Sequence, residues 1–180
     1  MKSQDEGEFR AFVATHRVAL VRTAYLVCGD RDEAEDLTQT ALLKLHPAWN
    51  RAKSARNRDA YVRRILVNTH LSRIRRRRVA QILTDRLPDK AGPDSTAGLA
   101  DRSVLMAALA RLPARRRATV VLRYWEDLPE AEVAHILGCS VGAVRSQAFK
   151  GLAELRRDPE LVELFRDRST LSAHAVEARL

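Results

Sequence analysis

The sequence predicts an all-α protein made of two small helical domains joined by a flexible linker, with a helix-turn-helix in the second domain. Three observations support this fold class. The 180-residue chain contains only 7 Gly and 6 Pro, the residue types that interrupt helices. Apolar residues make up 46% of the chain, and they recur at helical spacing without the alternation typical of strands. The stretch 84–98 is rich in Pro, Gly, Asp and Ser, which is the composition of a linker.

The first domain is predicted over 1–83 and begins with two helices. Apolar residues recur at helical spacing over 9–28, and Gly29 follows where a helix commonly ends. Asp32 is the expected N-cap of the second helix, because a glutamate three positions later completes a capping box and further carboxylates suit the positive end of the helix dipole. This helix is expected to stop at Pro47.

A loop over 50–57 and a long basic helix over 58–80 complete the predicted first domain. The helix combines an apolar stripe with a face that is nearly all positive. The segment 51–86 carries twelve basic and two acidic side chains, so it accounts for the whole net charge of +9. Such a concentrated charge predicts a polyanionic partner, nucleic acid first and an anionic membrane second. A solvated, solubilising face is the simpler alternative.

The second domain is predicted over 99–158, followed by a tail over 159–180 with weak helical character. Leucines at helical spacing mark its first helix. Pro113 suits the first turn of the next helix, which is expected to reach about Tyr124.

Residues 128–150 carry the strongest local signal, a helix-turn-helix. Pro129 opens a short helix that Gly138 ends, and Ser140 can cap the following helix, which is expected over 141–157. The first turns of such a helix enter the major groove, where Arg suits guanine and Gln suits adenine. Base-reading candidates are the outward-facing Gly142, Arg145, Ser146, Gln147 and Lys150, and phosphate-binding candidates are Arg115, Arg116, Arg117 and Arg123. An ordinary helical hairpin in a bundle core is the alternative.

The basic helix over 58–80 is a second candidate for nucleic-acid binding. Tyr61, Asn68, His70 and Ser72 lie among its arginines. Aromatic rings stack on unpaired bases, amide and hydroxyl groups bond to them, and arginines follow the backbone. Two such surfaces separated by a linker suggest that two DNA elements are read at once.

The acidic segment 30–45 is interpreted as a protein-binding helix. Its carboxylates gather at the helix start, where capping and the helix dipole already explain them, so we predict no metal site. Leu37, Leu42 and Leu45 supply apolar contacts. Cys28 and Cys139 are isolated from each other and from His, and no nucleophile and base can be assembled.

We therefore expect no cofactor and no enzymatic activity. No apolar run approaches the roughly 20 residues of a membrane span, so we expect a soluble protein working in the cytoplasm.

Three segments resemble the extracytoplasmic-function (ECF) group of bacterial RNA polymerase sigma factors, which keep only regions two and four. They are DEAEDLTQTALLKLHPAW, AYVRRILVNTHLSRIRRRR and LPARRRATVVLRYWEDLPEAEVAHILGCSVGAVRS. The resemblance covers about 9–157 and is nearest to short actinobacterial members. It implies a non-enzymatic sigma factor that binds core RNA polymerase and directs initiation from promoter DNA.

The resemblance also assigns roles to residues. Binding to core polymerase falls to Asp36, Leu37, Gln39 and Leu42. Minus-ten recognition and melting fall to the first domain, with Arg56, Arg58, Tyr61, Arg63, Arg64, Asn68, Arg73, Arg75 and Arg76. Within it, the loop ending at Arg58 would capture a flipped base. Minus-thirty-five recognition falls to the helix-turn-helix residues named above, together with Ser140.

Some positions depart from the family's usual residues. Thr40 replaces a common Glu in the core-binding segment, and Ala143 and Gln147 replace a frequent Thr and Arg or Lys in the helix-turn-helix. The last two imply a different preferred promoter sequence. An anti-sigma factor is a further candidate partner.

Two rival functions remain at this point. A stand-alone helix-turn-helix regulator on an operator would leave the acidic helix and the second basic surface unused. A nuclease using the carboxylates of 32–36 would need a divalent metal.

Overall fold

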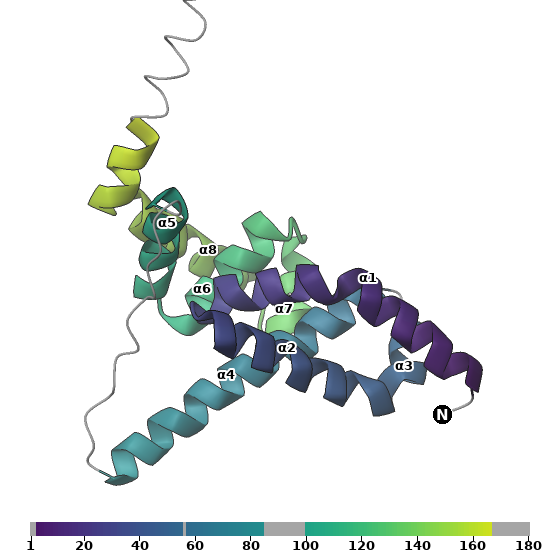
Figure 1. The fold of residues 1–180 in the computed structure, drawn as a ribbon. Coiled ribbons are helices and arrows are strands. Elements are labelled where there is room, and N and C mark those ends of the chain that lie inside the picture. The colour runs from purple at the N-terminus through teal and green to yellow at the C-terminus, as the bar shows by residue number, and fades with distance from the viewer. Residues whose placement is uncertain (1–2, 56, 85–99, 167–180) are drawn as a thin grey trace, which may run out of the picture.

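The computed structural model describes residues 3–55, 57–84 and 100–166, and every regular element in them is helical. The first group of helices comprises α1 (Ser3–Cys28), α2 (Arg31–Leu45), the 3₁₀ turn η1 (His46–Ala48), α3 (Trp49–Lys53) and α4 (Arg58–Thr84). The second comprises α5 (Ala100–Arg111), α6 (Ala114–Val120), the π-helical turn η2 (Val121–Trp125), α7 (Glu130–Leu137) and α8 (Val141–Arg156). Residues 159–166 form a last short helix. The expected all-α fold class is confirmed (Figure 1).

Local signals set most helix ends where the sequence predicts them. Gly138 adopts the left-handed conformation, with φ of 60°, and ends α7, as glycine can do without steric cost. Ser140 Oγ accepts a hydrogen bond from the Ala143 amide at 3.1 Å and caps α8. The expected cap of α2 at Asp32 is wrong. Asp30 is the cap, because its Oδ1 accepts a hydrogen bond from the Glu33 amide at 2.6 Å, and the helix begins at Arg31.

The expected loop over 50–57 is helical in its first part. Trp49 and Ala52, on α3, are both almost completely buried. Burial of this indole against α1 stabilises a short turn of helix that the polar composition of the segment does not favour. Helix α1 also begins six residues earlier than expected, at Ser3.

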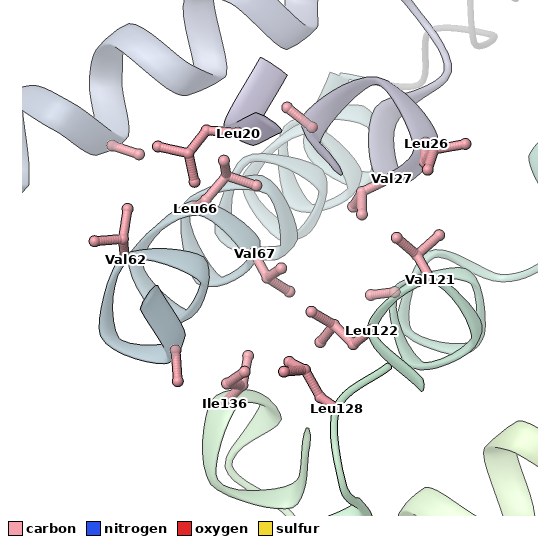
Figure 2. Close-up of a cluster of buried hydrophobic side chains, with 14 of the residues drawn as sticks. Leu20, Leu26, Val27, Val62, Leu66, Val67, Val121, Leu122, Leu128 and Ile136 are labelled. Atoms are coloured by element: carbon pink, nitrogen blue, oxygen red, sulfur yellow. The ribbon is translucent and has the colours of Figure 1, made fainter. Parts of the chain in front are cut away.

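The two groups of helices share one hydrophobic core, which the linker interpretation did not anticipate. Val67 of α4 faces Leu122 of η2 across this core, near Leu128, just before α7, and Ile136 on α7, whereas Leu66 points toward α1 (Figure 2). All five side chains are buried. The predicted linker, 84–98, lies almost entirely outside the described residues. Helix α4 of the first group packs against α7 and α6 of the second.

Two further features concern the first and the last described helices. By length and composition α1 could cross a bilayer, contrary to the expectation from the sequence. Its Phe12, Leu20 and Val27 are nevertheless buried in the shared core, as in a core helix of a folded domain. The helix at 159–166 is anchored by Arg111, whose Nε donates to Asp158 Oδ2 at 2.9 Å.

Candidate nucleic-acid interface

The first turns of helix α8 are exposed to solvent on one side and packed against the domain on the other. Val144 is completely buried beneath the helix, whereas Gly142, Arg145, Ser146 and Lys150 are exposed. Arg145 Nε donates to Glu130 Oε2 at 2.6 Å. The guanidinium is thus held through Nε, and its terminal nitrogens remain available for the bidentate contact that arginine makes with guanine.

The arginines of α6 divide into surface and buried groups. Arg115 is exposed and donates to the Leu137 carbonyl at 2.8 Å. Arg116 Nε donates to Gln147 Oε1 at 3.3 Å, so it orients that amide. Arg123, on η2, donates to a backbone carbonyl before α7. The expectation that Arg117 binds phosphate is wrong for this conformation, because this side chain is only 8% exposed.

Helix α4 carries the second basic surface. Its distal half projects from the bundle (Figure 1) and exposes Arg75 and Arg76. Asn68 is exposed and Tyr61 is half-buried. Arg58 stacks over the Trp49 ring with its guanidinium carbon 5.2 Å from the ring centroid, as expected for a cation–π pair. The predicted contact at Arg56 lies outside the described residues.

The proximal part of α4 is covered by the second group of helices. Arg63 Nη2 lies 2.6 Å from Glu126 Oε2, and Arg64 Nη1 lies 3.0 Å from His135 Nε2. Asn57, just before α4, donates its amide to the Glu132 carboxylate. The sequence pattern placed these arginines on a basic face but gave no sign that Glu126 and His135 would contact them.

Helix α2 presents a mixed acidic and apolar face. Asp36 and Gln39 are exposed and Leu42 is half-buried. Leu37 is fully buried, so the expectation that it contacts a partner is wrong: it belongs to the core. Leu43 is 74% exposed and was missed, although its position off the apolar stripe of the helix could have identified it.

Asp36 also links the acidic and basic surfaces. Arg73 Nη1 donates to Asp36 Oδ2 at 2.7 Å, and Arg73 Nη2 donates to Thr40 Oγ1 at 2.8 Å. The predicted core-binding and minus-ten residues are therefore adjacent on α2 and α4.

Buried ionisable groups gather where α1, α2, α4 and α6 meet. Burial, together with the positive charges of the nearby Arg117, Arg77 and Arg73, lowers the pKa of His70 from its ordinary 6.5 to about 4. Burial likewise lowers the pKa of Arg117 and raises the pKa of the Cys28 thiol to about 11. The histidine is therefore neutral and the thiol protonated at neutral pH, so the thiol is not activated as a nucleophile and the histidine carries no charge.

The described residues contain no cluster of three or more His, Cys, Asp or Glu that could hold a metal ion. The carboxylates at the start of α2 serve as a cap, in Asp30, and as partners of α4 arginines, in Glu33 and Asp36. This arrangement favours protein and nucleic-acid contacts over metal-dependent cleavage.

Comparison with known proteins identifies the family. The model "Sigma-70 region 2" matches residues 12–79, and the model "Sigma-70, region 4" matches residues 102–155. The chain is 40% identical over 157 residues to the RNA polymerase sigma-E factor of Streptomyces avermitilis, covering 87% of this chain and 88% of that protein. The chain belongs to the ECF RNA polymerase sigma factors.

Other relatives agree with this assignment. The ECF sigma factor SigL of Mycobacterium tuberculosis is 30% identical over 155 residues, which cover 82% of this chain and 86% of that protein. A solved structure of the sigma factor RpoE in complex with the anti-sigma factor NepR, from Bartonella quintana, has the same fold, with a TM-score of 0.67 and 23% identity over 87% of this chain and 97% of that chain. The resemblance found in the sequence is thus confirmed.

Family membership fixes the general activity. This ECF sigma factor directs promoter-specific transcription initiation by RNA polymerase, and it is a non-enzymatic subunit of that machine. Its region two corresponds to the first group of helices and its region four to the second. Neither the stand-alone regulator nor the nuclease accounts for both regions.

Proposed function

We propose that the two basic surfaces divide promoter recognition between them, region four holding the duplex minus-thirty-five element and region two binding the melted minus-ten strand. The carrying observation is the exposed first half of α8, whose reading side chains stand on a buried Val144 and a Ser140 cap. Arg145 and Gln147 are the base readers, and the exposed Arg115 and Lys150 bind phosphates. Phosphate contacts position the helix, while contacts to base edges give specificity.

Region two would bind single-stranded DNA along α4. Tyr61 offers a stacking ring, Asn68 offers an amide, and the projecting arginines follow the backbone. The surface beside Arg58 includes an open hollow of about 360 Å³ lined by Phe12, His16 and Asn57, among others. An aromatic and amide lining of this kind suits one flipped base.

Two protein partners are also proposed. Core polymerase would dock on the α2 face formed by Asp36, Gln39, Leu42 and Leu43, because it joins carboxylates to an exposed leucine. An anti-sigma factor is a further partner, since the solved neighbour is described in complex with one. Because its partners would be core polymerase and promoter DNA, we propose that this protein acts in the cytoplasm.

The division of recognition is tested by pairing variants with altered promoters. A promoter is first selected from a random DNA library by the reconstituted holoenzyme. Arg145→Ala should reduce initiation about tenfold or more on the intact promoter, yet match the wild type once the minus-thirty-five element is replaced. Initiation by Asn68→Ala should still depend on the minus-thirty-five element. On a template already melted at minus ten, however, this variant should no longer discriminate among non-template strand sequences. If both variants respond alike to both changes, the proposed division is wrong.

A further inference from the structure

A ladder of polar contacts joins α2 to α4. Its contacts recur every four residues along α4 and run in the opposite direction along α2, as expected where two packed helices are antiparallel. The rungs are Lys44 with Thr69, Arg73 with Asp36 and Thr40, and Arg77 with Glu33. The central rung therefore connects a residue expected to bind core polymerase, Asp36, with one expected to bind the minus-ten strand, Arg73.

Arg73 is the more enclosed of the two arginines in this ladder. Its side chain is 24% accessible, whereas that of Arg77 is 64% accessible. Nη1 of Arg73 donates to Asp36 Oδ2 at 2.7 Å, and Nη2 donates to Thr40 Oγ1 at 2.8 Å. These two acceptors lie one helical turn apart on α2, so they hold the planar guanidinium at two points. Both terminal nitrogens of Arg73 thus face α2.

The same contact orients the carboxylate of Asp36. This side chain is 66% accessible and belongs to the α2 face proposed above as the docking site of core polymerase. An exposed side chain without a fixed partner loses rotational freedom when another protein binds it, which weakens the binding. The hydrogen bond from Arg73 fixes one carboxylate oxygen in advance, and the second oxygen can still accept from a partner. Asp36 is therefore ordered before docking.

The geometry of α4 separates Arg73 from the arginines that project from the bundle. Arg75 is exposed, and a rotation of about 200° around the helix axis separates it from Arg73. The two side chains consequently leave nearly opposite sides of α4. A nucleic-acid strand that contacts Arg75 would not lie on the side where Arg73 meets α2.

We propose that Arg73 is a positioning residue for the docking of core polymerase and does not contact the minus-ten strand. It holds the Asp36 carboxylate in one orientation on the α2 face, and Thr40 fixes the guanidinium in turn. The arginines of α4 thus serve two purposes: Arg73 supports the core-docking face, and Arg75 remains available for DNA. This inference rests on the proposed docking of core polymerase on α2.

The first test measures binding of the full chain to purified core polymerase, in competition with labelled wild-type protein at fixed salt. Arg73→Gln should weaken binding about three- to tenfold, the cost of ordering one free side chain on docking. Arg73→Lys keeps a charged donor for Asp36 and should restore part of the loss. Arg75→Gln is the matched control, because it removes the same charge from an exposed position on the same helix, and it should bind core polymerase like the wild type. Wild-type binding by Arg73→Gln would overturn the proposal.

A double-mutant cycle shows whether Arg73 acts through Asp36. Once Asp36→Ala has removed the carboxylate, adding Arg73→Gln should weaken core binding no further. Additive losses would mean that Arg73 acts on its own, as a structural residue or a direct contact, and would overturn the proposal. Asp36→Ala alone tests the underlying function: if it binds core polymerase normally, the α2 docking face is wrong and this inference falls with it. If Asp36→Ala binds weakly and Arg73→Gln binds normally, only the positioning role is wrong.

The second test asks whether Arg73 contacts DNA. Holoenzyme assembled at saturating core polymerase is titrated with a fluorescein-labelled oligonucleotide of the minus-ten non-template strand over a range of salt concentrations. Loss of one phosphate contact lowers the slope of log affinity against log salt by about 0.7 on single-stranded DNA. Arg73→Gln should leave this slope unchanged, whereas Arg75→Gln should lower it. A slope lowered by Arg73→Gln would show that Arg73 binds a phosphate, and would overturn the proposal.

Discussion

Among single residues, the buried His70 has the most direct experimental consequence. It is 2% exposed, and Arg73 and Arg77 of α4, Arg117 of α6 and Glu33 of α2 surround it. Its Nδ1 is 3.9 Å from Glu33 Oε1, beyond hydrogen-bond distance. Adding a proton to this ring would place a cation next to three arginines.

His70 should therefore make stability dependent on pH. Because its pKa is about 4 in the folded protein and 6.5 ordinarily, the folded state binds fewer protons between these values. Its contribution is fully present above pH 6.5 and is lost as the pH falls towards 4, by on the order of 3 kcal/mol. Urea unfolding at several pH values checks this: the wild type should lose more stability across this window than His70→Gln. Parallel curves for the two proteins would contradict the assignment.

Glu130 is a positioning residue for Arg145. Since the pair is exposed, with side chains 31% and 69% accessible, its own energy is below about 1 kcal/mol. Glu130→Ala should therefore weaken selection of the preferred base only a few-fold, while Arg145→Ala removes it. Initiation on promoters substituted at each minus-thirty-five position measures both, and Glu130→Gln should restore part of the selection. An equal loss of initiation on every substituted promoter would point to a structural role instead.

At the level of elements, α6 and α8 approach each other closely at Gly151. A Cβ at this position would lie 2.5 Å from Val120 Cγ2, so the Val120 side chain or one of the helices would have to shift. The packing of region four thus requires that position 151 carry no side chain, in addition to the apolar contacts around it.

Gly151→Ala should destabilise the protein by about 1–3 kcal/mol, despite the better helix propensity of alanine. Gly142→Ala on the same helix is the matched control, because the nearest atom to its Cβ would be Ser140 Oγ at 4.0 Å. The control should be neutral or stabilising by up to about 1 kcal/mol. Thermal unfolding of the two variants compares them, and equal melting temperatures would refute the steric argument.

The element ends also show what the sequence could predict. Gly138 and Ser140 act through their own backbone and side chain, so local signals were sufficient. The choice of Asp30 over Asp32 as the α2 cap depends on the path of the chain after Gly29, with φ of 90°. Helix α3 forms because Trp49 is buried by residues distant in sequence, a tertiary effect that overrides local composition.

At the level of the whole molecule, two nucleic-acid surfaces could be predicted from the charge pattern, but their mutual arrangement could not. Leu122 and Ile136 fit the periodicity of their own helices equally well whether they face region four or region two. Arg63 and Asn57 find their acidic partners 63 and 75 residues away, in Glu126 and Glu132, so no spacing rule connects them. The sequence thus predicts the parts of the proposed promoter-reading surface, and packing determines how the two regions sit against each other.

Directed initiation is a property of the whole molecule, because it requires both core binding and promoter recognition. Leu43→Ala should impair it by weakening the docking of α2 on core polymerase, and this exposed residue should leave folding unchanged, unlike the buried Leu37. Arg145→Ala should impair it by a separate route, without affecting association with core polymerase.

The most direct measurement is in vitro transcription with purified core polymerase at fixed salt, comparing the wild type, Leu43→Ala and Arg145→Ala, with core binding measured in parallel. The sigma-factor mechanism predicts initiation at a defined start site with the wild type and a loss with each variant, accompanied by weaker core binding only for Leu43→Ala. A wild-type protein that neither binds core polymerase nor directs initiation, yet retains a specific DNA fragment by itself, would contradict it.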